Sequence, residues 1–327
     1  MNILVVGGAG YIGSHTARLL QREGHDVWIY DNLTTGHRQA ALPGRLIEGD
    51  LLDRTRLVEV LTGRRIEGVL HFAASALVGE SVTNPGKYYQ NNVVGTCTLL
   101  EAMRQAGVSR IVFSSTCATY GTPQQVPITE REPQRPINPY GFTKLVIEQA
   151  LRDYAAAYGW GYAALRYFNA AGAAADGQIG EDHDPESHLI PVVLQVALGQ
   201  RPSVTIFGED YPTVDGTCLR DYIHVEDLAA AHLAALERLP AGSGLELNLG
   251  TGRGHTVRQV IDACRRVTGH SIPIVAGPRR AGDPAELVAD ASLAEKVLDW
   301  RPRFLDIEPI VASAWQWHRA HPRGYAD

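Results

Sequence analysis

Residues 3–13 read Ile-Leu-Val-Val-Gly-Gly-Ala-Gly-Tyr-Ile-Gly, an apolar run followed by a glycine-rich turn. The run at 3–6 has the length and composition of a buried strand. A helix is expected after the turn, because Ile12, Thr16, Leu19 and Leu20 recur at helical spacing. The glycines therefore lie where a strand passes into a helix.

The spacing of these glycines is typical of a dinucleotide-binding turn. Gly7 permits the tight turn, Gly10 a close approach of backbone to pyrophosphate, and Gly13 the packing of helix on strand. The N–H groups at the start of the helix favour an anion. Asp31 ends the second expected strand, where a carboxylate binds the ribose hydroxyls and repels a 2′-phosphate. The pattern predicts NAD, with Asp50 after the third strand near the adenine amino group.

Apolar runs alternate with helical patterns through the first half of the chain. Strands are expected at 27–30, 46–47, 69–72, 111–114 and 162–168, and helices at about 92–104 and 141–158. This alternation predicts an α/β fold with a Rossmann-type doubly wound parallel sheet. After Gly172 the pattern is less regular, with a helix expected at 189–198 and strands at 204–207 and 245–249. We predict an NAD-binding domain at 1–172 and a smaller α/β substrate domain at 173–327, part of which packs back onto the sheet.

Composition excludes several classes of protein. The 327 residues are 45% hydrophobic and 20% charged, which is typical of a folded domain. A net charge of −6 gives no electrostatic signature of nucleic-acid or anionic-membrane binding. With no secretory signal or spanning apolar run, a cytoplasmic location is expected. The four cysteines are far apart and form no C-x-x-C pair, so neither a disulfide framework nor a metal site is expected.

A tyrosine and a lysine are candidates for the chemistry. Tyr140 and Lys144 are four residues apart on an expected helix, so they share a face. The preceding strand ends in Ser114-Ser115-Thr116, and such strands direct their carboxyl ends to the ligand. An ammonium and a positive nicotinamide lower a phenol pKa from ~10 toward neutrality. The pattern therefore predicts Tyr140 as a general base.

Further motifs extend over essentially the whole chain. They are Gly-Gly-Ala-Gly-Tyr-Ile-Gly-Ser-His (7–15), Val-Gly-Glu-Ser (78–81), Tyr-Gly-Phe-Thr-Lys (140–144), Arg-Tyr-Phe-Asn (166–169), Arg-Asp-Tyr-Ile-His (220–224), Pro-Arg-Arg-Ala-Gly-Asp (278–283) and Trp-Gln-Trp-His (315–318). With these motifs the chain resembles the extended short-chain dehydrogenase/reductase family. The first and third mark the broad family, and the last four narrow the resemblance to its nucleotide-sugar epimerases.

The resemblance implies an isomerase that interconverts UDP-galactose and UDP-glucose through a 4-keto intermediate. Tyr140 would take the proton of the sugar 4-hydroxyl while the C4 hydride passes to NAD and returns to the other face. Thr116 would bond the same oxygen, and Lys144 would hold the nicotinamide ribose. The resemblance also implies a homodimer through helices near 92–104 and 141–157.

The resemblance further implies the residues that bind each ligand. Those expected at NAD are Gly7, Gly10, Tyr11, Ile12, Gly13, Asp31, Asn32, Asp50, Leu51, Phe72, Ala73, Asn92, Ser114, Tyr140, Lys144, Tyr167 and Phe168. Those expected at the UDP-sugar are Thr116, Asn169, His188, Leu189, Thr205, Ile206, Phe207, Arg220, Tyr222, Arg280 and Asp283. Among the latter, the two arginines would grip the diphosphate. His188 could equally cap the helix that follows it.

Three positions depart from the family pattern. Thr116 replaces a serine but keeps its hydroxyl, and Ala76 replaces a lysine found near the cofactor phosphates in some members. Leu287 replaces a tyrosine that crowds the sugar 2-position in some members. A smaller side chain there leaves UDP-GlcNAc and UDP-pentoses open as alternative substrates.

Two other functions compete with a 4-epimerase. A nucleotide-sugar 4,6-dehydratase resembles this chain but places Asp-Glu after the catalytic threonine, where Cys117-Ala118 stand here. A non-catalytic dinucleotide-sensing scaffold has no need of Tyr140 and Lys144 on one helix face. Cys117-Ala118 therefore disfavours the dehydratase, and the Tyr140–Lys144 pair disfavours the scaffold.

Overall fold

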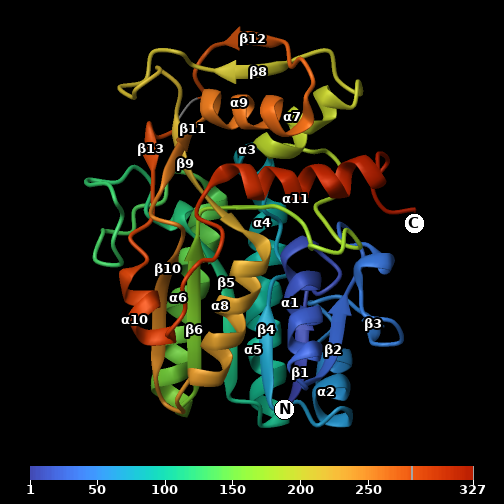
Figure 1. The fold of residues 1–327 in the computed structure, drawn as a ribbon. Helices are drawn as coiled ribbons and strands as arrows, with labels where there is room; N and C mark the ends of the chain where they lie inside the picture. Colours follow the sequence, from blue (N-terminus) through green and yellow to red (C-terminus); the bar gives the residue numbers. More distant parts are fainter. Residues whose placement is uncertain (281–282, 327) are drawn as a thin grey trace.

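The computed structural model describes residues 1–280 and 283–326, and its largest element is a seven-stranded sheet (Figure 1). The strand order is β10-β6-β5-β4-β1-β2-β3, and every neighbouring pair is parallel. The strands are β1 (Asn2–Val6), β2 (Asp26–Asp31), β3 (Leu46–Glu48), β4 (Gly68–His71), β5 (Arg110–Thr116), β6 (Gly161–Tyr167) and β10 (Gly244–Leu249). The predicted Rossmann-type doubly wound sheet is confirmed. The order reverses between β1 and β4, the place where such sheets bind ligands.

Helices cover both faces of this sheet because its strands are apolar on both faces. In β1, Ile3 and Val5 belong to one core, and Leu4 and Val6 to the other. The first core includes residues of α1 (Tyr11–Arg22), α8 (Val225–Arg238) and α10 (Ser292–Leu298). The second includes residues of α2 (Arg54–Gly63), α5 (Gly95–Ala106) and α6 (Pro139–Tyr158).

A smaller region lies beyond the carboxyl ends of the large sheet, at the top of Figure 1. Strand β9 (Leu219–His224) pairs with β7 (Asn169–Ala171), β11 (Gly254–Thr256) and β13 (Glu286–Leu287). Strands β8 (Val204–Phe207) and β12 (Ile274–Gly277) form a separate pair. Residues of α7 (Leu189–Ala197), α9 (Val257–Thr268) and α11 (Ile307–Ala320) share a third core. The second half of the chain therefore builds this region and also supplies β10 and α8 to the large sheet.

The short elements between β4 and α6 lie near the start of α6. They are α3 (Val78–Thr83), α4 (Pro85–Tyr88), a π-helical turn η2 (Tyr89–Val94) that leads into α5, and a 3₁₀ turn η3 (Cys117–Thr119) after β5; a further 3₁₀ turn, η1 (Arg38–Ala40), precedes β3. Among the described residues, no helix has the length and apolarity needed to cross a bilayer.

Most predicted boundaries lie within two residues of those observed, and the start of α6 differs in a useful way. This helix begins at Pro139 and not at about residue 141, because Asn138 caps it by accepting a hydrogen bond from the Gly141 N–H at 2.8 Å. Proline suits the first helical position. Tyr140 is therefore held in a capped first turn. Phe72, expected in a strand, lies one residue past the end of β4.

Candidate active site

The glycine turn is shaped by the backbone that surrounds it. Gly7 has φ +78°, and a Cβ there would clash with the backbone of Ala73 after β4. A Cβ on Gly13 would clash with the Gly7 carbonyl oxygen. Gly10 is the N-cap of α1, and no side chain caps this helix. Its first N–H groups and its dipole suit a pyrophosphate, so this turn fits NAD.

Two alanine substitutions separate folding from cofactor binding in this turn. We expect Gly13→Ala to lower stability and cofactor content together, because the helix must move off Gly7. Gly10→Ala should fold normally, since the nearest atom to its Cβ is the Gly7 oxygen at 3.4 Å, but should hold NAD more weakly. Thermal unfolding and the absorbance of released NAD measure the two effects. Equal cofactor content in Gly10→Ala and the unaltered protein would contradict this assignment.

The acidic side chains expected at the adenosine end lie at the carboxyl ends of β2 and β3. Asp31 ends β2 and accepts hydrogen bonds from the N–H groups of Ala9 at 3.0 Å and Leu33 at 2.9 Å. Burial raises the pKa of Asp31, and these N–H groups oppose the rise. Asn32 donates to the exposed Asp50 carboxylate at 3.0 Å. These three side chains thus border the glycine turn.

The residues expected after β4 are held in place by a buried asparagine. Phe72 and Ala73 donate their N–H groups to the Val6 carbonyl oxygen at 2.8 and 3.2 Å. The Asn92 amide is fully buried and bonds both the N–H and the carbonyl of Ser75. The Asn92 amide thus fixes the loop that follows Ala73. Leu51 is buried in the core shared with α2 and α5.

Lys144 lies beneath the end of β5. Its side chain is buried, and Nζ donates to the Ser114 carbonyl oxygen at 2.7 Å. The same Nζ is 5.9 Å from the centre of the Tyr140 ring, as the four-residue spacing predicts. Burial lowers the pKa of Lys144 to about 7, with Glu148 opposing the fall. Burial thus weakens the hold of Nζ on its proton, and the Glu148 carboxylate one turn away helps to keep the ammonium charged.

The Tyr140 phenol lies among Thr116, Tyr167 and Tyr88. Burial raises its pKa well above the ordinary value, the nearby Tyr167 adds to the rise, and a hydrogen bond with Thr116 opposes it. The Thr116 hydroxyl accepts the Ala118 N–H at 3.2 Å. The predicted fall toward neutrality is thus absent in the chain alone, where burial dominates. A fall in the Tyr140 pKa requires the positive charge of a bound nicotinamide, which the prediction included.

A buried ionic network joins α6 to the sheet, and sequence reasoning did not identify it. Glu148 accepts from Arg166 Nη2 at 2.6 Å and from Ser115 Oγ at 2.5 Å. Arg166 also contacts Glu246 of β10 at 2.6 Å. Glu148 follows Lys144 by one helical turn, a spacing that could have revealed it. The network positions the helix that carries Tyr140.

Three aromatic residues expected at the cofactor lie at the end of β6 and at the start of α1. Tyr167 is its last residue, and its hydroxyl shares a hydrogen bond with Ser114 Oγ. Phe168 follows and is buried against Cys117. Tyr11 begins α1 and donates its hydroxyl to the Gly172 carbonyl oxygen at 2.6 Å, while Ile12 packs on the core beneath.

The two arginines expected at the diphosphate have different surroundings. Arg220 is largely buried and donates to the Asp283 carboxylate and to the carbonyl oxygens of Leu219 and Pro284 at 2.8 and 2.9 Å. Arg280 is exposed, with its guanidinium 4.1 Å from the Phe207 ring centre. Asp283, expected at a ribose, is therefore paired with Arg220. Ala281 and Gly282 of the same motif lie outside the described residues.

The remaining expected substrate residues lie on four elements, β7, β8, β9 and the start of α7. Thr205, Ile206 and Phe207 form most of β8. Asn169 donates to the Asp221 carbonyl oxygen at 3.0 Å, which joins β7 to β9 next to the buried Tyr222. His188 occupies the N-cap position of α7 before Leu189, but its side chain makes no capping bond. The alternative that His188 is the cap residue of this helix is therefore confirmed by its position, and its side chain is directed to other partners.

Charge effects connect the arginine pair to the Tyr140 site. Burial raises the pKa of Cys117 to about 12, and the Arg220 charge opposes the rise. Cys117 immediately follows Thr116 and also acts on the Tyr140 phenol. Thr116 and Tyr140 thus lie together at the carboxyl end of β5, and the charge of Arg220 acts on the cysteine beside them.

Residues 3–250 match the model of the NAD dependent epimerase/dehydratase family. The chain belongs to this family. It is 54% identical to the UDP-glucose 4-epimerase of Halalkalibacterium halodurans over 100% of this chain and 98% of that protein. The structure of the Brucella ovis UDP-glucose 4-epimerase in complex with NAD is 53% identical, with a TM-score of 0.93 over 96% of this chain and 97% of that one.

A further solved structure contains a nucleotide as well as the cofactor. The Bifidobacterium longum UDP-glucose 4-epimerase in complex with NAD⁺ and UDP is 41% identical, with a TM-score of 0.95 over 99% of this chain and 100% of that one. These similarities confirm the predicted family, its Rossmann-type fold, its dependence on NAD and an epimerase activity. The glycine turn after β1 and the Tyr140 site at the end of β5 both lie at the carboxyl ends of the parallel strands, as expected for this family.

Proposed function

We propose that the protein interconverts UDP-galactose and UDP-glucose through a 4-keto intermediate. The observation that carries this proposal is the grouping of Tyr140, Lys144 and Thr116 at the carboxyl end of β5. It occurs in a chain whose curated relatives, at 49 to 54% identity over nearly its whole length, are UDP-glucose 4-epimerases. The same chain has Cys117-Ala118 where a dehydratase needs an acid and a base.

Each residue of the group has a distinct task. Bound NAD supplies the acceptor and donor of the sugar C4 hydride. Tyr140 removes the proton from the 4-hydroxyl and returns it after the keto sugar has turned over. Thr116 bonds the reacting oxygen and holds it toward Tyr140. Lys144, anchored on Ser114, adds positive charge beside the phenol and the nicotinamide ribose.

The nucleotide end must hold the substrate, because the sugar presents both of its faces in one cycle. Arg220 and Arg280 suit the diphosphate, since guanidinium groups donate paired bonds to phosphate oxygens. Strand β8, with Thr205 to Phe207, suits the uracil. In this proposal residues 1–172 bind NAD and elements of 173–327 bind the UDP-sugar. The homodimer and the cytoplasmic location stay predictions from the sequence.

A direct assay tests the proposal. Purified protein is mixed with UDP-galactose, and the anomeric proton signals of both UDP-sugars are followed by NMR. We expect conversion to an equilibrium mixture with UDP-glucose. Protein that contains NAD but produces no UDP-glucose would overturn the proposal.

Leu287 favours UDP-GlcNAc as a second substrate. It is partly buried in β13 and packs against the cluster that contains Phe168 and Cys117, the residue that follows Thr116. A leucine leaves more space there than the tyrosine of some relatives. We expect Leu287→Tyr to lower kcat/KM for UDP-GlcNAc about 10-fold or more, because overfilling a packed site is unfavourable, and to change the UDP-galactose rate little.

The volume-conserving Leu287→Met variant is the matched control for this prediction. Both variants are assayed with UDP-galactose and UDP-GlcNAc, and the ratio of the two kcat/KM values is compared. A Leu287→Tyr variant with an unchanged ratio would show that this side chain does not limit substrate choice.

A further inference from the structure

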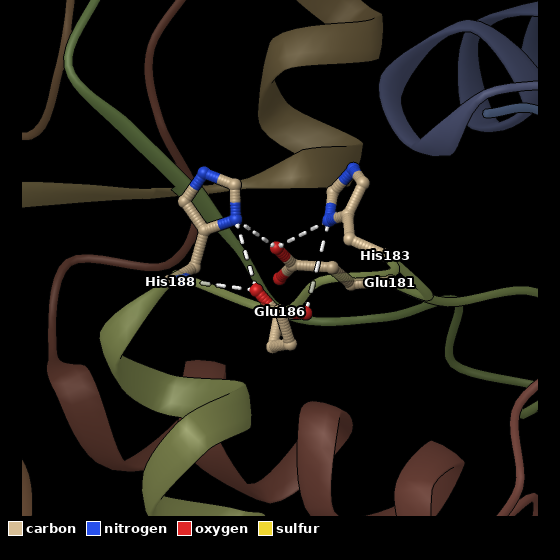
Figure 2. A group of neighbouring side chains, drawn as sticks. All are labelled: Glu181, His183, Glu186 and His188. Carbon is tan, nitrogen blue, oxygen red and sulfur yellow. Dashed lines mark hydrogen bonds and ion pairs between the residues drawn. The ribbon is translucent and has the colours of Figure 1, made fainter. Parts of the chain in front are cut away.

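Four metal-ligating side chains converge in the segment that leads from β7 to α7. Glu181, His183, Glu186 and His188 each offer one atom, and these atoms all lie within 4.8 Å of one another (Figure 2). Their sequence spacing is Glu-x-His-x-x-Glu-x-His. The cysteine spacing gave no indication of this site, because none of the four side chains is a cysteine.

Two buried polar atoms in this cluster form ion pairs but no hydrogen bond of good geometry. They are Oε1 of Glu181, whose side chain is only 3% exposed, and Nδ1 of His183. Both histidines nevertheless approach this oxygen, His188 Nδ1 at 2.7 Å and His183 Nδ1 at 3.3 Å. Buried polar atoms in folded proteins are almost always partnered. These two atoms therefore favour a further partner, such as a cation, between the four side chains.

The charge of the cluster fits a divalent cation. Two carboxylates and two neutral imidazoles carry a net charge of −2, which one such ion neutralises. Protonated histidines would also balance the charge, but each Nδ1–H would then point along a hydrogen bond to a carboxylate. His183 Nδ1 lies 3.3 Å from Glu181 Oε1 and 3.7 Å from Glu186 Oε2, so it is shared between two carboxylates and makes no hydrogen bond of good geometry with either. Convergence on one point therefore favours coordination over simple ion pairing.

The ligand types narrow the class of cation. Imidazole nitrogen with carboxylate oxygen suits Zn²⁺ and similar first-row ions, whereas Mg²⁺ and Ca²⁺ prefer oxygen ligands alone. Four protein ligands fill a tetrahedral coordination sphere, which is typical of structural sites.

We propose that Glu181, His183, Glu186 and His188 bind one Zn²⁺-class divalent ion. The site lies where three helices meet. Trp317 of α11 donates to the Glu181 carbonyl oxygen at 3.2 Å, and His188 directly precedes α7. The His183 ring centre is 6.3 Å from that of Tyr11, the first residue of α1. The ion thus connects residues 181–188 to both the cofactor helix α1 and the substrate region. One of its ligands is the His188 imidazole, which was expected to contact the substrate.

Metal content tests the proposal directly. The full-length protein, freed of any affinity tag, is incubated with Zn²⁺ and desalted, and bound zinc is measured by mass spectrometry. We expect about one zinc per chain. His188→Gln should fall below about one tenth of that value, and because His188 is half exposed this variant should fold. His270→Gln, which removes an exposed histidine elsewhere, is the matched control and should retain zinc.

Two further measurements keep the test decisive if a variant loses stability. Co²⁺ in place of Zn²⁺ should give the intense visible absorption of a tetrahedral site, and His183→Gln should remove it. A chelator should lower the melting temperature of the unaltered protein and leave that of His188→Gln unchanged. Equal zinc content in His188→Gln and His270→Gln, or no zinc in the unaltered protein, would overturn the proposal.

Discussion

Tyr140→Phe lowers kcat for UDP-galactose by at least about 100-fold, the lower end of the usual contribution of a general base, and leaves the fold and bound NAD unchanged. The substitution removes one oxygen and no ring contact, so the edge-to-face contact with Tyr88, at 6.5 Å between ring centres, is retained. The interaction of the phenol oxygen is with the Thr116 side chain, so its loss should affect the site more than the fold. Activity and stability should therefore separate.

Steady-state rates by NMR, with melting temperature and released NAD measured on the same samples, check this expectation. Tyr158→Phe is the matched control, since Tyr158 is an exposed tyrosine at the other end of α6. It should retain full activity. A Tyr140→Phe variant with nearly the unaltered rate would assign the base to another group, and Thr116→Val would then be the next variant to compare.

Local features of the site could be predicted from the sequence because short-range geometry determines them. The turn at Gly7 depends on a positive φ and close backbone contacts within one strand-turn-helix unit. Tyr140 and Lys144 share a face because they are four residues apart on a helix. The cluster between Glu181 and His188 is also local, because its four side chains come from eight consecutive residues. Its Glu-x-His-x-x-Glu-x-His spacing is a signal that the sequence contains.

Contacts between distant segments could not be predicted in this way. Arg220 and Asp283 are 63 residues apart, and only the pairing of β13 with β9 brings them together. The sequence therefore predicted two separate substrate contacts where the structure has an ion pair. Likewise Glu246 reaches Arg166 only because β10 pairs with β6 across 80 residues of chain. Such pairings are set by the packing of whole elements.

The Arg166 network gives the largest expected effect on stability. Arg166 is 1% exposed and Glu148 is fully buried, so Arg166→Met leaves a buried carboxylate without its main cation. Breaking a buried pair by removing one partner costs about 3–5 kcal/mol. Equilibrium unfolding in urea measures the free energy of unfolding. We expect a fall of that size, together with weaker activity because α6 carries Tyr140.

Two comparisons identify the physical cause of this loss. Arg152 contacts Glu246 at 2.5 Å and Glu148 at 3.4 Å, but its side chain is 31% exposed and Glu148 keeps Arg166, so Arg152→Met should cost no more than about 1 kcal/mol. Adding Glu148→Gln to Arg166→Met removes the uncompensated charge and should restore part of the lost stability, since a buried pair is costly mainly when only half is present. If Arg166→Met and Arg152→Met were equally stable, burial would not be what makes this network matter. If the double variant were less stable than Arg166→Met, the loss would come from packing around the methionine and not from a stranded carboxylate.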